Sequence, residues 1–221
     1  MTTATATAEA ATEAELTHTS VTVPMGTLKA AALFAAKNDI RTGLNGVCLE
    51  VNSTANTVRL IATNGRVLGA FRVTDGDIQG PSVTAIIPAA LIASLKARNE
   101  ADITVRVGDI LCAVRSVSLT CGETSVAGVT LNARFPQWQA VLPTIDDDAI
   151  APASLNFEDL AVFVKAGKLL GTKAAPVARQ QGTRGTLVLL NGVYGFVGVT
   201  MPWHESEVTV PAAIPAWALE A

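Results

Sequence analysis

The sequence predicts an α+β fold built from repeated βαβββ units. Three segments with alternating apolar residues each end at a proline, in residues 21–24, 85–88 and 208–211. After the first two prolines the apolar spacing becomes that of a helix, and proline suits the first turn of a helix because its missing N–H needs no partner there. The order of strand, proline and helix therefore recurs along the chain, which indicates an internal repeat.

The first unit contains a helix between its first strand and three further strands. Apolar side chains at helical spacing follow Pro24, at Leu28, Ala31, Ala32 and Ala35. Alternating apolar residues then predict strands at residues 47–51, 57–63 and 68–73. The pair Asn64-Gly65 between the last two strands is a strong signal for a tight turn. The first unit is therefore predicted to be βαβββ.

The later units repeat this order. The second begins with the strand that ends at Pro88, followed by a helix to residue 98. Its further strands are predicted at residues 103–107, 110–114, 117–121 and 125–131. The third unit is predicted as a strand at residues 153–156, a helix at residues 157–170 and strands at residues 186–190 and 194–200. A fourth unit only begins, with a strand at residues 208–210 and a helical stub at residues 214–219.

These units group into one complete domain and one truncated domain. Residues 17–143 hold two units and form the complete domain. Residues 151–221 form a partial domain, which would need ~50 more residues to be complete. The polar residues 144–150 are predicted to be a linker. Residues 1–16 are almost entirely Thr, Ala and Glu, and are predicted to be a disordered tail.

The composition is that of a folded protein without a membrane segment. Hydrophobic residues make up 49% of the chain and charged residues 16%. The longest apolar stretch, residues 85–95, is interrupted by a proline and a serine and is shorter than the ~20 residues of a spanning helix. Cys48, Cys112 and Cys121 lack the spacing of metal ligands, which favours a reduced, cytoplasmic location. The net charge of −3 does not exclude a DNA-binding surface, because lysines can be concentrated on one face.

Three short motifs resemble those of a known family. Residues 41–47 are Arg-Thr-Gly-Leu-Asn-Gly-Val, residues 62–68 are Ala-Thr-Asn-Gly-Arg-Val-Leu, and residues 135–143 are Phe-Pro-Gln-Trp-Gln-Ala-Val-Leu-Pro. In this order and spacing they resemble the bacterial sliding clamp, the β subunit of DNA polymerase III. The resemblance covers residues 19–143, which match the family's middle domain, and is fainter over residues 150–200, which match part of its last domain. The resemblance leaves open whether the chain is a phage or plasmid version of the clamp.

The motifs also depart from the family pattern. Asn64, Arg66 and Val67 stand where the family has Asp, His and Arg. Thr42 and Gly43 replace aromatic residues that reach toward DNA in the family. These departures imply that DNA contact is weaker or altered. The family's first domain is expected to have no counterpart here.

The resemblance implies a protein that is not an enzyme and needs no cofactor. Members of the family encircle duplex DNA as processivity factors and dock DNA polymerase or other proteins through clamp-binding peptides. Their rings contain more βαβββ units than this chain holds, so self-association into a ring, or into a dimer through the third unit, is expected. Two alternatives stay open. One is a clamp-like decoy or accessory module that does not encircle DNA, and the other is an unrelated α+β enzyme, which the few His, Cys and Tyr residues disfavour.

The helices of the family line the hole of the ring, which implies a set of basic residues that face DNA. On this chain the set is Lys29, Lys37, Arg41, Lys96, Lys165 and Lys168. Contact with phosphates requires positive charge but no sequence-specific geometry. Lys165 and Lys168 share a helix face because they are three residues apart. The alternative is that these side chains are ordinary solvated residues of an outer surface.

A peptide-binding pocket is implied beneath the second and third motifs. The corresponding residues are small or apolar, as a pocket requires: Thr63, Gly65, Val67, Leu68, Pro136 and Val141. Apolar residues at the C-terminus of the last domain complete the pocket in the family, and this chain is expected not to supply them. The alternative is that Leu68 and Val141 are core residues and that Pro136 only ends a strand.

Other candidate sites have simpler explanations. Residues 146–148 are three adjacent aspartates, which cannot easily converge on one metal ion, and an exposed linker explains them. Gly192, Gly195 and Gly198 miss the dinucleotide-binding spacing and indicate a hairpin. The aromatic residues of the second domain are expected in the core or an interface rather than in a base-stacking platform. They are Phe157, Phe163, Trp203 and Trp217.

Overall fold

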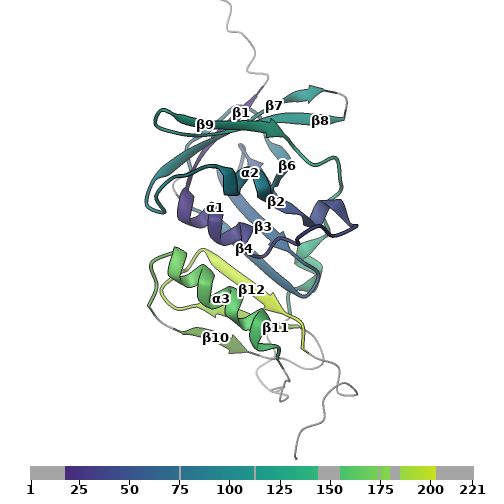
Figure 1. Ribbon diagram of the computed structural model, residues 1–221, viewed down its shortest axis with the longest axis vertical. Helices are drawn as coiled ribbons and strands as arrows, with labels where there is room; N and C mark the ends of the chain where they lie inside the picture. Colours follow the sequence, from purple (N-terminus) through teal and green to yellow (C-terminus); the bar gives the residue numbers. More distant parts are fainter. Residues whose placement is uncertain are drawn as a thin grey trace, which may run out of the picture.

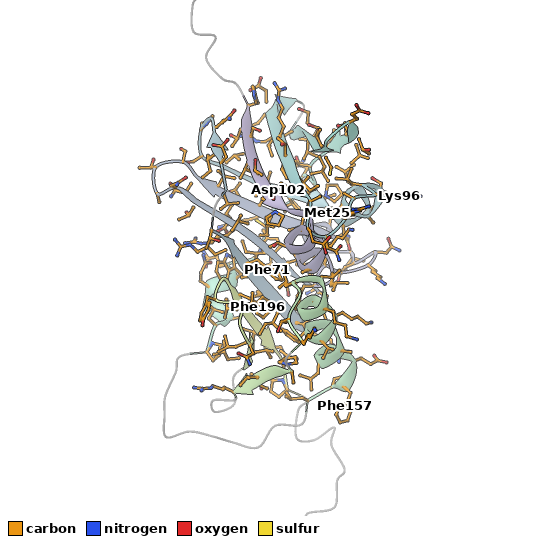
Figure 2. The ribbon with its side chains drawn as sticks, turned by 90° about the vertical axis from the view of Figure 1, so that its left-hand side faces the viewer. Met25, Phe71, Lys96, Asp102, Phe157 and Phe196 are labelled. Carbon is orange, nitrogen blue, oxygen red and sulfur yellow. The ribbon has the colours of Figure 1, made fainter. Side chains whose placement is uncertain are left out.

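The computed structural model describes residues 18–74, 76–111, 113–143, 155–173, 175–179 and 185–202. The predicted tail, the predicted linker and the segment expected to begin a fourth unit lie outside these ranges. The described residues form two antiparallel sheets, with the helices along one side of the molecule (Figure 1 and Figure 2). This is an α+β fold, as predicted. No helix in the described ranges is long and apolar enough to cross a membrane.

The first unit has the predicted βαβββ order. Its elements are β1 (Thr19–Pro24), α1 (Met25–Ala32), β2 (Gly46–Asn52), β3 (Thr57–Thr63) and β4 (Val67–Val73), with a short 3-10 helix, η1 (Thr42–Leu44), before β2. Pro24 directly precedes α1. Leu28 and Ala31 of this helix are fully buried, as their spacing predicted.

The second unit repeats the order with an additional short strand. Its elements are β5 (Ile78–Gln79), β6 (Val83–Pro88), α2 (Ala89–Ser94), β7 (Asp102–Leu111), β8 (Val114–Cys121) and β9 (Thr124–Val129). The prediction of a separate strand at residues 110–114 is wrong, because Ile110 belongs to β7 and Val114 begins β8. The pairing of β7 with β8 shifts register between Val107 and Ile110. This bulge interrupts the alternation of apolar residues, which made one strand resemble two.

The third unit is described from its helix onward. Its elements are α3 (Phe157–Leu169), β10 (Pro176–Arg179), β11 (Thr186–Leu190) and β12 (Phe196–Thr200). The side chain of Asn156 caps α3 by accepting a hydrogen bond from the backbone N–H of Glu158 at 2.7 Å. The sequence predicted a strand at residues 153–156. Residues 155 and 156 are not in a strand, and residues 153 and 154 lie outside the described ranges. The sequence did not indicate β10, because its 4 residues begin with proline and show no usable alternation.

The third unit joins the first through one sheet. The five-stranded sheet has the order β5–β1–β7–β8–β9, and the seven-stranded sheet has the order β10–β11–β12–β4–β3–β2–β6. β12 and β4 are antiparallel neighbours, and α3 packs beside α1 over this pairing (Figure 1). Gly198 of β12 lies opposite Gly69 of β4. We name the contact between these two units the joint.

Phenylalanine rings from both units fill the joint. Phe34 follows α1, Phe71 lies on β4, Phe163 on α3 and Phe196 on β12, and together they form the phenylalanine cluster. The ring centroids of Phe34 and Phe163 are 5.1 Å apart, and those of Phe71 and Phe196 are 4.9 Å apart. Figure 2 shows Phe71 and Phe196 where the two units meet. Ring pairs at such separations contribute about 0.5–1.5 kcal/mol beyond the burial of their surface.

The two facing glycines leave room for these rings. A Cβ atom on Gly69 would lie 2.7 Å from two carbons of the Phe34 ring. A Cβ atom on Gly198 would lie 2.8 Å from Cζ of Phe196. Non-bonded carbon atoms do not lie this close together, so a ring or the backbone would have to move to make room for either Cβ atom. The packing of the joint therefore requires glycine at both positions.

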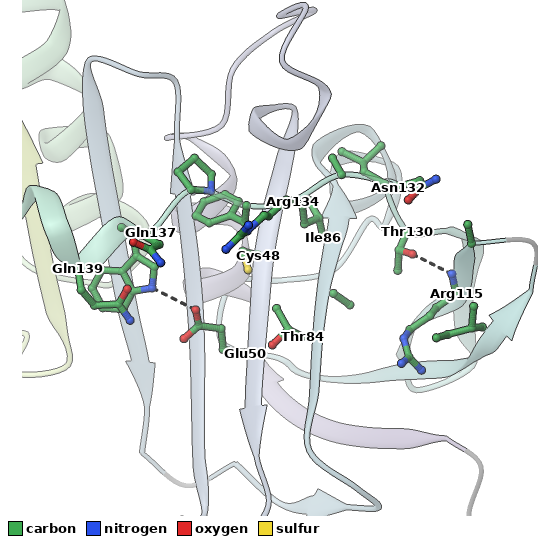
Figure 3. A pocket seen from close by; sticks show the side chains of 18 residues that line it. Cys48, Glu50, Thr84, Ile86, Arg115, Thr130, Asn132, Arg134, Gln137 and Gln139 are labelled. Carbon is green, nitrogen blue, oxygen red and sulfur yellow. Dashed lines mark hydrogen bonds between the residues drawn. The ribbon is translucent and has the colours of Figure 1, made fainter.

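A second apolar cluster covers the opposite face of the seven-stranded sheet. Residues 131–143 cross this face and place Trp138 against Cys48, Ile61, Leu68, Ala70 and Val199, which together form the outer cluster. The indole Nε1–H of Trp138 donates a hydrogen bond to Glu50 at 3.1 Å (Figure 3). The backbone N–H of Leu131 donates to the carbonyl of Ile86 on β6 at 2.9 Å. The crossing segment is therefore fixed at more than one point.

We expect Gly69→Ala to lower the free energy of unfolding by about 1–3 kcal/mol, because the added methyl group overpacks the phenylalanine cluster. Gly128→Ala is the matched control, since Gly128 is also a strand glycine and its Cβ would meet Leu91 at 3.4 Å. Chemical denaturation of wild type and both variants measures the difference. Equal losses in the two variants would contradict this account of the joint.

Candidate functional site

The pocket residues predicted from the sequence line one cavity in the structure. They are Thr63, Gly65, Val67, Leu68, Pro136 and Val141. This cavity, named the turn cavity, has a volume of about 210 Å³ and lies where the β3–β4 turn meets the 3-10 helix η2 (Trp138–Val141). The lining also includes residues that the prediction did not contain: Arg41, Leu44, Arg66, Gln137, Trp138, Val199 and Met201.

Side-chain hydrogen bonds hold the β3–β4 turn in one shape. The Thr63 hydroxyl donates to the carbonyl of Val67 at 2.7 Å and accepts from the N–H of Gly65 at 3.1 Å. The side-chain oxygen of Asn64 accepts from the N–H groups of Arg66 and Val67, each at 2.9 Å. Gly65 has a φ of 92°, which residues with a side chain rarely adopt. The turn therefore presents a preformed wall to the cavity.

The turn cavity has an apolar floor and a partly exposed apolar mouth. Val67, Leu68 and Val199 are almost completely buried. Val141 and Met201 remain 43% and 46% exposed. If an apolar side chain entered from solvent, that side chain and the apolar lining of the cavity would both lose contact with water. The cavity can therefore hold an apolar anchor of a ligand.

The third unit closes one side of the turn cavity. The backbone N–H of Met201, just after β12, donates to the carbonyl of Arg66 at 2.8 Å. The guanidinium of Arg66 also reaches Asp159 on α3, with 2.9 Å between Nη2 and Oδ2. Val199 and Met201 could not be found from sequence, because only the pairing of β12 with β4 brings them here. Trp138 and Arg66 could have been found, since both belong to the motifs that carry the family resemblance.

Part of the predicted DNA-facing set lines a groove between α1, α2 and α3. This helix groove has a volume of about 1140 Å³ and includes Lys29, Lys37 and Lys165. The ammonium group of Lys29 donates to the carbonyl of Ala97 at 2.6 Å and to the side-chain oxygen of Asn99 at 3.2 Å. Two of the hydrogen-bond donors of Lys29 are therefore used within the protein. Lys37 and Lys165 are exposed, and much of the remaining lining is alanine and aliphatic.

The other members of that set are dispersed. Lys168 is exposed in the last turn of α3, and Lys96 is exposed just after α2 on the helix side (Figure 2). Arg41 lies at the turn cavity instead, where it forms an ion pair with Asp39 at 2.8 Å. Hydrogen bonds from the side chain and backbone of Arg41 lower the pKa of Asp39 to about 2. A Cβ on Gly65 would lie 3.0 Å from the Arg41 guanidinium, so Arg41 borders the turn.

A further cavity, which the sequence did not indicate, lies beneath residues 130–139 on the outer face of the seven-stranded sheet (Figure 3). Its volume is about 470 Å³, and its lining includes Cys48 and Glu50. Burial raises the pKa of the Cys48 thiol to about 12, with a smaller contribution from the charge of Glu50. Cys48 is therefore a core thiol and not a nucleophile at neutral pH.

The remaining candidates from the sequence have no site around them in the described ranges. No group of three His, Cys, Asp or Glu side chains is placed there to hold a metal ion. Residues 146–148 and the two tryptophans after residue 202 lie outside the described part of the chain. Gly192 occupies the turn before β12 and Gly198 lies in β12, as a hairpin requires. Phe163 is fully buried, as expected, whereas Phe157 is 86% exposed and is not a core residue.

Comparison with known proteins gives a consistent result for the fold. No protein-family model matches the sequence, and no curated protein matches it significantly. A sliding clamp from Pseudomonas aeruginosa bound to griselimycin matches with a TM-score of 0.60 and 18% identity, over 84% of this chain and 65% of the clamp. The DNA polymerase III subunit β of Borrelia burgdorferi, in complex with a natural product, matches with a TM-score of 0.62 and 12% identity, over 84% of this chain and 62% of that protein. The DNA polymerase III β subunit of Thermotoga maritima matches with a TM-score of 0.57 and 14% identity, over 84% of this chain and 65% of that protein.

The chain has the sliding-clamp fold. The fold expected from the three motifs is thereby confirmed. The chain spans about two thirds of the length of these clamps. At these identities the likeness establishes how the chain folds, and the role of the turn cavity rests on its own geometry.

We expect Cys48 to resist alkylation by iodoacetamide at pH 8 in a variant that carries Cys112→Ser and Cys121→Ser. With a pKa of about 12, its thiolate fraction at that pH is on the order of 10⁻⁴. Adding Trp138→Ala should make Cys48 reactive, because the indole covers the outer cluster. Intact-mass spectrometry over time measures both rates, and labelling in denaturant is the control. Fast labelling with Trp138 in place would contradict the burial.

Proposed function

We propose that this chain is a sliding-clamp-like processivity factor for DNA polymerase, which encircles duplex DNA as an oligomer and docks other replication proteins. The observation that carries the proposal is the turn cavity, because all the pocket residues implied by the family resemblance line it in a chain with the clamp fold. The role requires no bond breaking, so no catalytic residue is assigned. A cytoplasmic location suits this role.

The turn cavity suits a short extended peptide with apolar anchors. Its floor is buried and its mouth is apolar, so an entering anchor would be removed from water. Burial of one side chain of leucine size contributes about 1.5–3 kcal/mol. The turn already satisfies its own hydrogen bonds, so recognition depends on the anchors more than on the peptide backbone. Affinity should therefore be modest and concentrated in two or three side chains.

Duplex DNA would lie along the helix side of the molecule. Lys37, Lys96, Lys165 and Lys168 are exposed on or beside the helices. Ammonium groups attract phosphates without reading the base sequence. Lys29 is less free to reach a phosphate than these four lysines, because its ammonium group donates to the carbonyl of Ala97. This distribution of lysines supports binding to duplex DNA without sequence preference.

A clamp-like module that does not encircle DNA is the second candidate function. The helix groove favours it, because its lining is largely alanine and aliphatic. Gly43 stands where the family resemblance has an aromatic residue that reaches toward DNA. A Cβ at Gly43 would lie 3.1 Å from the carbonyl oxygen of Arg134 and 3.2 Å from Cβ of Ala133, so a larger residue there would need these neighbours to shift. The two candidates differ in whether duplex DNA is bound.

We expect Val141→Asp to weaken peptide binding by about tenfold or more, because an apolar anchor would desolvate the carboxylate at the mouth. Calorimetric titration with a clamp-binding peptide that carries two apolar anchors measures the change, and griselimycin is the second probe. Val177→Asp on β10 is the matched control, since Val177 is 45% exposed and Val141 is 43% exposed. Equal binding by wild type and Val141→Asp would remove the turn cavity as the site.

The floor of the cavity is tested separately with Leu68→Lys. Leu68 is 5% exposed, so thermal unfolding must first show that this variant folds. A folded variant should not bind either probe, because the ammonium group occupies the space of the anchor. If wild type binds neither probe, the docking function is wrong and the fold is unaffected.

We expect duplex DNA to bind without sequence preference and to dissociate as salt is raised. Replacing Lys165 and Lys168 by Ala should weaken binding and reduce the slope of log K against log salt by about 0.9 for each lost contact. Fluorescence anisotropy with two unrelated duplexes measures both effects, with Arg179→Ala on β10 as the control. Binding that is insensitive to salt would contradict the proposed surface. No binding at low salt would favour the module that does not encircle DNA.

A further inference from the structure

The cavity of about 470 Å³ on the outer face of the seven-stranded sheet has no part in the proposed function, and we name it the outer cavity. It lies beneath the crossing segment, between two points where that segment is fixed (Figure 3). At one point the N–H of Leu131 donates to the carbonyl of Ile86. At the other the indole of Trp138 donates to Glu50. A volume of this size is sufficient for a small-molecule ligand.

The register of β2 and β6 divides the floor of the outer cavity into a polar half and an apolar half. Glu50 of β2 lies opposite Thr84 of β6, and Cys48 lies opposite Ile86. All four residues line the cavity, because side chains two residues apart on a strand point to the same face. A ligand in the cavity would therefore meet polar groups at one end and apolar groups at the other.

Arg134 brings a positive charge into the outer cavity from the crossing segment. It lies between the two fixed points, and Figure 3 shows its side chain above Cys48. No hydrogen bond or ion pair joins its guanidinium to another residue within the described ranges. A guanidinium has five N–H donors in a planar arrangement that matches a carboxylate. The donors of Arg134 are therefore available to a carboxylate of a ligand.

Glu50 supplies a negative charge that still has acceptor capacity. Its Oε1 accepts from the Trp138 indole at 3.1 Å, and its Oε2 lies 3.5 Å from Nη1 of Arg59. An ionised carboxylate has about four lone-pair sites, so it can accept further hydrogen bonds. In the described part of the chain Glu50 forms no ion pair with Arg134, although both line the outer cavity. Opposite charges therefore border one cavity without pairing with each other.

These two charges determine the class of ligand. A simple anion that bound Arg134 would also meet the negative charge of Glu50, and a simple cation at Glu50 would meet Arg134. A ligand that carries both a carboxylate and an ammonium group matches both residues. The apolar half of the floor, which contains Cys48 and Ile86, suits an aliphatic side chain. An α-amino acid combines these three features.

We propose that the outer cavity binds a free α-amino acid with an aliphatic side chain. The carboxylate of the ligand binds Arg134, and its ammonium group binds Glu50. The hydroxyl of Thr84, which lies opposite Glu50, offers the ammonium group a second acceptor. The aliphatic side chain lies over Cys48 and Ile86. This inference goes beyond the proposed function, since neither DNA nor a docked peptide takes part.

The indole N–H of Trp138 provides a direct measurement, because it is bound to the carboxylate that would bind the ligand. L-leucine should shift the NMR signal of this N–H until the shift saturates, and Trp138→Phe assigns the signal. Two probes of similar shape separate the charges, since 4-methylpentanoate lacks the ammonium group and 3-methylbutylamine lacks the carboxylate. Both should bind at least tenfold more weakly than leucine. The absence of a saturable shift with leucine, or equal binding by either probe, would overturn the proposal.

Charge-removing substitutions test the two contacts separately. Arg134→Gln and Glu50→Gln should each weaken leucine binding by about tenfold or more, because charge-assisted hydrogen bonds are roughly twice as strong as neutral ones. Glu50→Gln keeps a side-chain oxygen that can accept from the Trp138 indole, so the crossing segment stays fixed. Arg72→Gln and Glu123→Gln are the matched controls, since both residues are exposed and neither lines the outer cavity. Full affinity in either cavity variant, or an equal loss in its control, would contradict the proposed contacts.

Discussion

The packing of the phenylalanine cluster over two facing glycines is the constraint on which the rest of the structure depends. Gly69 and Gly198 let β4 and β12 pair directly beneath the rings of Phe34 and Phe163. This pairing turns two separate units into one sheet. It also carries the end of β12 to the β3–β4 turn, where Met201 is bound to the carbonyl of Arg66. A larger residue at either glycine would overpack the joint, which also supplies one side of the turn cavity.

The turn cavity is therefore a product of long-range folding rather than of one motif. The β3–β4 turn supplies a rigid wall through its own hydrogen bonds. The segment that crosses the outer face of the sheet supplies the second wall, and the indole of Trp138 anchors it to Glu50. β12 supplies the third wall. An apolar binding surface assembled from three distant segments is typical of sites that lie between structural units.

Sequence patterns predicted the repeated units because those units depend on local periodicity. β3 and β11 begin and end at the predicted residues, since apolar alternation and turn residues bound them clearly. The pattern failed where a bulge interrupted β7 and where β10 was too short to alternate. The motifs placed the six pocket residues together, whereas Val199 depends on a pairing that no local pattern encodes. The hydrogen bond of Lys29 to the carbonyl of Ala97 is likewise invisible in the sequence, because it joins residues far apart in the chain.

The position of Arg66 has a thermodynamic consequence. Its backbone carbonyl binds the end of β12, its guanidinium binds Asp159 of α3, and the residue lines the turn cavity. A ligand in the cavity would touch the first and third units at once, so it would bind more weakly to any state in which those units separate. By mass action, occupancy would then raise the free energy of opening the joint. A docked partner would therefore stabilise the contact between the first and third units, and the joint would open least often while the partner is bound.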